Sequence, residues 1–327
     1  MKISKVFKKV AGGVGVLALI ISLVVLQQGS TRSPQSKNPK HLDVFSKSLL
    51  GQKICVLGDT GSDTPEQYRV AAALEKQGCD QIRILGDLIY DDGLKSADDP
   101  LYQAAFVKPY ESLIQASQGP KFFMTLGNHD YQGNPGAWVE LAKRHHYLYI
   151  PHRYYAESYG PDEVCIATLD TSPYDSLKWF FKGFGQGAWV RDITDSFRNC
   201  AMTIALGHHP YWNSGHHGDA RAFLKGFLNR NIVGRFDIYM AGHEHFISDE
   251  GEAQGTHLVV SGAGGKEPTE SFREPKGGFV RSSLGFVVMT LSKNADQKIQ
   301  AKLDYVTEEA GTFAVHHSRT IVGKGIR

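Results

Sequence analysis

The sequence predicts an α/β (α+β) fold in which two mixed β-sheets pack together and helices flank them. Two features of the pattern lead to this prediction. Strand-like apolar runs alternate with helical patterns as far as residue 241, and three strand patterns then follow without helices between them. This change suggests two packed sheets with helices outside. The chain has 327 residues, 41% of them hydrophobic and 21% charged, a composition that suits one large layered domain.

The first elements have the order of a βαβ unit. The apolar run 53–57 is the first expected strand and is followed by Gly-Asp. Thr64 and Pro65 then open a helix, as cap and first-turn residue, and Gly78 ends it. The next strand covers residues 82–85 and again leads into Gly-Asp, which completes the unit.

The later elements continue this pattern. Residues 101–117 are mostly helical, with a break expected at Pro109. Further helices are expected over residues 134–146, 187–197 and 220–228. The remaining strands are expected over residues 122–126, 164–169, 201–206, 236–241, 257–261, 286–291 and 299–306. We find no internal repeat and no second domain.

The amino terminus carries an export pattern. Four lysines precede an uncharged, mostly apolar run at residues 10–26. The run is longer than the roughly 7–15 residues of a signal-peptide core and shorter than the ~20 residues of a membrane-spanning helix. Residues 1–28 are therefore interpreted as either a signal peptide or an N-terminal membrane anchor. In both cases the rest of the chain is exported, and it is periplasmic, secreted or anchored facing outside.

The remaining chain divides into three parts on composition. Residues 29–51 begin with Gly, Ser, Thr, Pro and Lys and are interpreted as a linker. Residues 52–310 hold the expected strands and helices and form the folded domain. Residues 311–327 are interpreted as a C-terminal tail.

The charge and the cysteines limit the partners and the compartment. The net charge is +2, and the body without its N-terminal lysines is close to neutral with no basic stripe, so we expect no nucleic-acid partner. We also expect a monomer. An even number of cysteines in an exported protein permits two disulfides. Free thiols in strand-like runs also pack as small hydrophobes, so both states stay open. The cysteines are Cys55, Cys79, Cys165 and Cys200.

Four short polar motifs, each directly after an apolar run, predict a pair of metal ions. They are Asp59-Thr60-Gly61, Gly86-Asp87-Leu88-Ile89-Tyr90, Gly127-Asn128-His129-Asp130 and Gly242-His243-Glu244-His245. Loops at the carboxyl ends of parallel strands converge on one edge. Their carboxylates, amide oxygen, phenol and imidazoles form a ligand set that iron, manganese and zinc prefer. Any one motif alone is commonly an ordinary turn or polar loop.

The same residues suggest the chemistry. Asp87 is the best candidate for a carboxylate that bridges two cations, because its loop also carries Tyr90. A two-metal centre clamps a phosphate and activates a water for in-line attack. The nearby imidazoles of His129, His216 and His217 could neutralise phosphoryl oxygens or protonate the leaving alcohol.

In this order, and together with Gly207-His208-His209-Pro210, the motifs resemble the metallophosphoesterase superfamily. Within it the chain resembles the purple acid phosphatase family, especially the small tartrate-resistant acid phosphatase type. Gly61 stands where most superfamily members have histidine, and Tyr90 follows Asp87 by three residues, as in the purple acid phosphatases. The resemblance covers roughly residues 52–291 and implies a calcineurin-like metallophosphoesterase sandwich, with residues 52–310 as the catalytic domain.

The resemblance also implies roles for single residues. Fe(III) would be held by Asp59, bridging Asp87, Tyr90 and His245. A second, divalent metal (Fe, Zn or Mn) would be held by Asp87, Asn128, His208 and His243. His129 would stabilise the transition state, and His217 falls at the position of an active-site histidine. His216 is a candidate for substrate binding, in place of an acidic residue in some relatives.

The implied function is that of an acid phosphatase that hydrolyses phosphate monoesters by attack of a metal-activated hydroxide. Its substrates would be small phosphate monoesters or phosphoproteins. Two alternatives stay open at this point. One is a phosphodiesterase or nucleotide pyrophosphatase on the same scaffold. The other is a non-catalytic exported interaction protein with a degenerate metal site.

Overall fold

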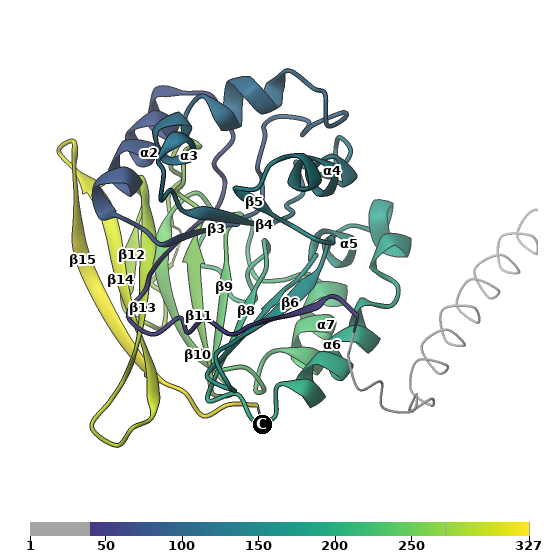
Figure 1. Ribbon diagram of the computed structural model, residues 1–327, viewed down its shortest axis with the longest axis vertical. Helices are drawn as coiled ribbons and strands as arrows, with labels where there is room; N and C mark the ends of the chain where they lie inside the picture. The colour runs from purple at the N-terminus through teal and green to yellow at the C-terminus, as the bar shows by residue number, and fades with distance from the viewer. Residues whose placement is uncertain (1–39, 272, 327) are drawn as a thin grey trace, which may run out of the picture. The chain divides into compact units, whose positions relative to one another are not determined.

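Two β-sheets face each other, with helices on the outer side of each (Figure 1). The computed structural model describes residues 40–271 and 273–326, and the predicted signal peptide or anchor at 1–28 lies outside this range. The predicted fold class is confirmed: both sheets are mixed, because each combines parallel and antiparallel neighbours.

The first sheet has seven strands in the order β15-β14-β13-β2-β3-β4-β5. Strands β2 to β5 are parallel, and β13 to β15 extend the sheet in antiparallel fashion beside β2. The bounds are Lys53–Leu57 (β2), Gln81–Leu85 (β3), Lys121–Thr125 (β4), Leu148–Tyr149 (β5), Gly285–Lys293 (β13), Ile299–Glu309 (β14) and Thr312–Val322 (β15).

The second sheet has eight strands in the order β1-β6-β7-β8-β9-β11-β10-β12. Its centre, from β7 to β11 in this order, is parallel. The bounds are Leu42–Phe45 (β1), Tyr155–Tyr159 (β6), Val164–Thr168 (β7), Met202–Leu206 (β8), Ile238–Ala241 (β9), Ile247–Ala253 (β10), Thr256–Ser261 (β11) and Phe279–Arg281 (β12).

In the structure, each helix comes after the strand that the sequence pattern predicted before it. The region predicted as a helix with a break at Pro109 forms a π-helix before this residue and a short α-helix after it. Gly78 ends α2 in the left-handed conformation and donates its N–H to carbonyls of the last turn. The bounds are Pro65–Gln77 (α2), Gln103–Val107 (η1), Glu111–Gln115 (α3), Gly136–Arg144 (α4), Ser172–Asp175 (α5), Leu177–Gly183 (η2, a 3₁₀-helix), Gln186–Ser196 (α6) and Ala222–Asn231 (α7).

Three apolar clusters hold the layers together. Because side chains alternate along a strand, Val56 faces the space between the sheets while Leu57 faces the outer helices. The inner cluster joins Val56 and Leu85 of one sheet to Ile204 and Met240 of the other. One outer cluster packs α2, α3 and α4 on the first sheet, and the other packs α6 and α7 on the second.

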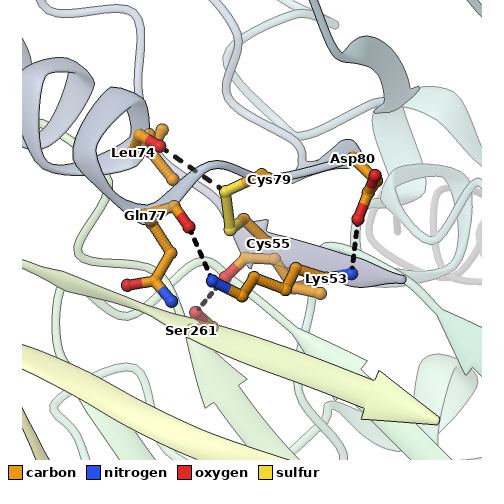
Figure 2. The surroundings of a disulfide bond; sticks show 8 residues. Lys53, Cys55, Leu74, Gln77, Cys79, Asp80 and Ser261 are labelled. Atoms are coloured by element: carbon orange, nitrogen blue, oxygen red, sulfur yellow. Dashed lines mark hydrogen bonds between the residues drawn. A yellow bond between two sulfur atoms is a disulfide. The ribbon is translucent and has the colours of Figure 1, made fainter. Parts of the chain in front are cut away.

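Two disulfides fasten the outer helices to the sheets in the same way on both sides. Cys55 in β2 is bonded to Cys79 directly after α2, as Figure 2 shows, and Cys165 in β7 is bonded to Cys200 shortly after α6. Each closes the end of a helix onto a central strand, a constraint typically worth about 2–4 kcal/mol. Two disulfides suggest an oxidising, exported environment. Among the helices of the described residues, none has the length and apolar character needed to cross a membrane.

A buried ion pair joins the two sheets. Arg83 in β3 donates to Glu157 in β6 through two nitrogens, with Nη1–Oε1 at 3.1 Å and Nη2–Oε2 at 2.7 Å. Both side chains are almost fully excluded from solvent, at 1% and 0% exposure. The guanidinium also lies 4.3 Å from the ring centroid of Phe123, and Tyr159 contributes a hydroxyl at 3.1 Å. The charge of Arg83 is thus paired through Nη1 and Nη2, while its buried Nε has no hydrogen-bond partner among the described residues.

The domain extends further at both ends than the composition indicated. The segment predicted as a C-terminal tail contains β15, which pairs along its whole length with β14. The segment predicted as a linker contains β1, which pairs in parallel with β6. Both strands lie at sheet edges, where about half of the side chains are exposed, and polar residues interrupt the apolar pattern of both.

Candidate metal centre

The predicted site residues follow strands of both sheets. Asp59, Asp87 and Asn128 come after β2, β3 and β4 of the first sheet. His208 and His243 come after β8 and β9 of the second. The carboxyl ends of these strands meet at one edge of the sandwich, and the distances below show that the loops converge as the sequence predicted.

One group of side chains gathers around the phenol of Tyr90. Its Oη lies 3.1 Å from Asp59 Oδ1, 3.2 Å from Asp87 Oδ2 and 3.3 Å from His245 Nε2. These are the four residues that the resemblance assigned to Fe(III). They include both carboxylates of the predicted ligand set.

A second group gathers around the imidazole of His208. Its Nε2 lies 3.0 Å from Asn128 Oδ1, 3.2 Å from His243 Nδ1 and 3.4 Å from Asp87 Oδ2. These are the four residues assigned to the divalent metal. Asp87 Oδ2 is therefore within contact distance of a member of each group, as a bridging carboxylate has to be.

Hydrogen bonds to the backbone determine which atom of each ligand faces the centre. The ring of His208 is held by a 2.8 Å contact from Nδ1 to the Leu85 carbonyl, which leaves Nε2 directed inward. His245 makes the equivalent 3.2 Å contact from Nδ1 to the Glu267 carbonyl. Asp59 Oδ2 accepts the N–H of His243 at 2.8 Å. Such outer contacts orient metal ligands and fix the tautomer of the imidazoles.

The backbone is strained at three of the ligands. Asp59, Asp87 and His243 have φ values of 60°, 51° and 72°. Left-handed conformations at residues other than glycine are uncommon and concentrate at functional sites, where the surrounding structure imposes them. Here each lies directly at the turn where a strand ends and its side chain is aimed into the centre.

Gly61 and Tyr90 are linked by close packing. A Cβ atom at position 61 would lie 1.9 Å from the Leu88 carbonyl oxygen, so only glycine fits there. The Gly61 carbonyl accepts the N–H of Tyr90 at 2.8 Å. The missing side chain at position 61 lets the loop after β3 pass close by, and this loop brings the phenol into the centre.

The electrostatics of the site fit a bound cation pair. Asp59 and Asp87 are 0% and 2% exposed. Burial raises the pKa of Asp59, and burial and both carboxylates raise the pKa of Tyr90 well above its ordinary value. Burial lowers the pKa of His245 to about 4 and holds that of His243 well below 6.5, which favours the neutral imidazole that a metal ligand requires. Buried carboxylates require compensating positive charge, and this mixed oxygen and nitrogen set suits iron, zinc or manganese.

His129 stands beside the centre with one nitrogen free to act. Its backbone N–H donates to Asp87 Oδ1 at 2.9 Å, and its Nδ1 lies 2.5 Å from the Asp91 carbonyl. Its Nε2 lies 3.9 Å from Asp87 Oδ2. The ring is therefore fixed through Nδ1, and its Nε2 lies on the side of Asp87.

His217 and His216 form a stack that leads outward from His243. The His217 ring lies 4.3 Å from that of His243, and the His216 ring lies 3.7 Å from that of His217. Both are partly exposed. The structure thus brings His217 next to a predicted metal ligand and sets His216 one ring further away.

Glu244 holds this stack, although sequence reasoning assigned it no role. It is fully buried, and its carboxylate lies 3.1 Å from Nδ1 of both His216 and His217. It also accepts the His217 N–H at 2.8 Å and an N–H of Asn213. Although burial opposes it, these bonds hold the pKa of Glu244 below its ordinary value. The sequence held one signal for Glu244: it lies between the two expected histidine ligands of the Gly-His-Glu-His motif.

Asp130 is a second residue that sequence reasoning left without a role. It is 1% exposed and accepts N–H groups of Gly127 at 2.8 Å and Leu88 at 3.2 Å. It thereby fastens the loop after β4 to the loop after β3. Burial, with the nearby charge of Asp87, raises the pKa of Asp130 to about 7.

Comparison with known proteins gives three findings. The calcineurin-like phosphoesterase family profile matches residues 52–246. Purple acid phosphatase 7 of Arabidopsis thaliana is 24% identical over 77% of this chain and 80% of its own length. Tartrate-resistant acid phosphatase type 5 of Rattus norvegicus is 25% identical over 63% of this chain and 67% of its own length.

A solved structure also resembles the chain. This structure, "GAP50 the anchor in the inner membrane complex of Plasmodium", matches with a TM-score of 0.68 at 19% identity. The match covers 84% of this chain and 89% of the other. At this identity the likeness concerns the fold alone.

Proposed function

The chain belongs to the calcineurin-like phosphoesterase family, and on this premise we propose that it is an acid phosphatase that hydrolyses phosphate monoesters at a dinuclear metal centre. The family and the purple acid phosphatase relatives support hydrolysis of phosphate esters. One observation carries the finer proposal. Asp87 Oδ2 lies 3.2 Å from Tyr90 Oη and 3.4 Å from His208 Nε2, so one carboxylate reaches both ligand groups.

The ligand groups suggest how two unlike metals would be held. The group with the phenol and two carboxylates suits Fe(III), and it consists of Asp59, Asp87, Tyr90 and His245. The group with the neutral amide suits a divalent iron, zinc or manganese ion, and it consists of Asp87, Asn128, His208 and His243. Bound together, two such ions would supply Lewis acidity toward a phosphoryl group and a nucleophile derived from water.

The remaining residues would bind and orient the ester. His129 Nε2 lies beside the bridging carboxylate and can donate when the imidazole carries both protons. We assign it the stabilisation of charge on the phosphoryl oxygens. His217 is held by Glu244 against His243 and would donate a proton to the leaving alcohol. His216 would contact the substrate at the outer end of the stack. Export of the domain is part of the proposal and is supported by the two disulfides.

Substrate preference tests the function directly. Purified full-length protein would be assayed with p-nitrophenyl phosphate and with bis-p-nitrophenyl phosphate at acidic pH. We expect the monoester to have the higher kcat/KM. A preference for the diester would contradict the proposal and favour a phosphodiesterase. If metal-loaded protein hydrolyses neither ester, the alternative of a non-catalytic interaction protein would be favoured.

Tyr90→Phe tests the assignment of the first metal. Burial beside two carboxylates disfavours phenolate, and a trivalent cation at this position would reverse that preference. The wild-type protein is expected to show a visible absorption band from phenolate bound to Fe(III), and Tyr90→Phe is expected to lack it. Tyr68→Phe, at a partly exposed position of α2, serves as the matched control and should keep the band. An unchanged spectrum in Tyr90→Phe would refute phenolate ligation of iron.

Glu244→Gln tests the positioning of His217. The substitution keeps the size of the side chain but removes the charge that faces the rings of His216 and His217. We expect kcat/KM for a phosphate monoester to fall by roughly 10–100-fold, the range for outer partners of a metal site. Glu252→Gln, an exposed glutamate in β10, is the control. If both variants retain wild-type kinetics, Glu244 does not position His217 for the reaction.

A further inference from the structure

An exposed aromatic face lies beside the metal centre and takes no part in the proposed reaction. It is formed by η2, the residue after it and the first turn of α7. Four apolar side chains are largely exposed: Leu177 at 73%, Phe181 at 78%, Phe184 at 44% and Phe223 at 50%. Phe180 lies in the middle, with ring centroids 5.4 Å from Phe184 and 5.5 Å from Phe223. We call these five residues the aromatic rim. A soluble domain does not usually leave so compact an apolar group exposed without a binding role.

The segments that carry the aromatic rim have an excess of positive charge. Residues 175–192 and 219–237, which carry the rim, contain four aspartates but seven lysines and arginines. The lysines and arginines are Lys178, Lys182, Arg191, Arg221, Lys225, Arg230 and Arg235. Because the whole chain has a net charge of only +2, this concentration is local. Asp175, two residues before Leu177, lies 3.6 Å from Arg221 and has a mostly buried side chain.

The rim is connected both to the metal centre and to the start of the described domain. Lys178 Nζ donates to Gln132 at 3.1 Å, three residues after His129. On the other side, α6 begins two residues after Phe184, and its Trp189 Nε1 donates to the Lys40 carbonyl at 2.7 Å. The described domain therefore begins close to the segment that carries the rim.

We propose that the aromatic rim docks on the surface of a membrane that contains anionic lipids. The phenylalanines would enter the interface between headgroups and acyl chains, and the surrounding lysines and arginines would contact the lipid headgroups. A second copy of this chain is a poorer partner, because a symmetric contact would bring two positive surfaces together. The proposal does not depend on the chemistry of the metal centre. It predicts that the side of the domain beside the centre faces the membrane.

A fluorescent label on the rim tests this docking in the full-length chain. All four cysteines are in disulfides, so Phe181→Cys introduces a single reactive thiol for an environment-sensitive dye. Val315→Cys in β15 is the matched control, also exposed and on the side of the domain opposite α5 (Figure 1). With phosphatidylcholine vesicles that contain phosphatidylglycerol, we expect a blue shift of the dye at position 181 and none at 315. The shift should be lost near 1 M salt, where the Debye length is about 3 Å.

Charge reversal separates docking at the rim from general attachment through the amino terminus. In the labelled Phe181→Cys chain, Lys178→Glu with Lys182→Glu should abolish the blue shift. Lys293→Glu with Lys298→Glu makes the same charge change at exposed positions around the β13–β14 turn and should leave the shift intact. The proposal is overturned if both pairs act equally, if neutral vesicles give the same shift, or if positions 181 and 315 respond alike. A shift without vesicles that grows with protein concentration would assign the rim to self-association instead.

Discussion

Asp87→Ala is expected to empty both metal positions and to lower kcat/KM for phosphate esters by more than roughly 100-fold. Changes in residues that only contact a metal ligand typically cost at most about 100-fold. The reason is the position of Asp87 Oδ2, which lies 3.2 Å from Tyr90 Oη in one ligand group and 3.4 Å from His208 Nε2 in the other. Every other predicted ligand is assigned to one metal only, so its loss would weaken that metal first. The measurements are metal content per chain and kcat/KM for a phosphate monoester.

Asp92→Ala is the matched control for this prediction. It removes an exposed carboxylate five residues further along the same loop and should change neither metal content nor activity. Thermal unfolding of both variants would show that they remain folded. If Asp87→Ala retains two metal ions per chain, Asp87 is not the bridging ligand.

Arg83→Met is expected to lower the free energy of unfolding by about 3–5 kcal/mol, the cost of leaving a buried charge without its partner. Arg83 is 1% exposed and its partner Glu157 is 0% exposed, and the pair connects β3 of one sheet to β6 of the other. The change leaves the Glu157 carboxylate buried without its cation, although the Tyr159 hydroxyl still donates to it. Denaturant unfolding with the disulfides intact measures the effect.

The double variant Arg83→Met with Glu157→Leu distinguishes this cause from a general packing defect. Replacing both partners by apolar residues removes the unpaired charge, so most of the lost stability should return. Arg144→Met removes an exposed arginine that pairs with exposed Asp98 and should have no measurable effect. A double variant as unstable as the single one would show that the ion pair is not the origin of the loss.

The ligand positions were accessible to sequence analysis because they depend on local pattern. Asp59, Asp87 and His208 each follow an apolar run closely, and the end of a strand is visible in a single stretch of sequence. The sequence around these residues did not show which of the two sheets each strand would join. Strand order depends on pairings such as β2 with β13, between residues more than 230 positions apart.

Charged residues inside buried elements concealed other parts of the fold. β10 contains Asp249 and Glu250, which break its apolar pattern, yet both are buried. Asp249 is compensated by Arg319 at 2.8 Å and by His317 at 3.1 Å, both in β15. Because these partners lie about 70 residues away in sequence, neither β10 nor β15 could be recognised from its own composition. Glu244 was missed for the same reason, since its partners belong to another loop.

The most direct test of the two-metal account is the metal content of active full-length protein, measured together with its visible spectrum. We predict two metal ions per chain, at least one of them iron, and an absorption band that disappears in Tyr90→Phe. A protein that hydrolyses phosphate monoesters with fewer than two metal ions per chain, or without iron and the band, would contradict the account.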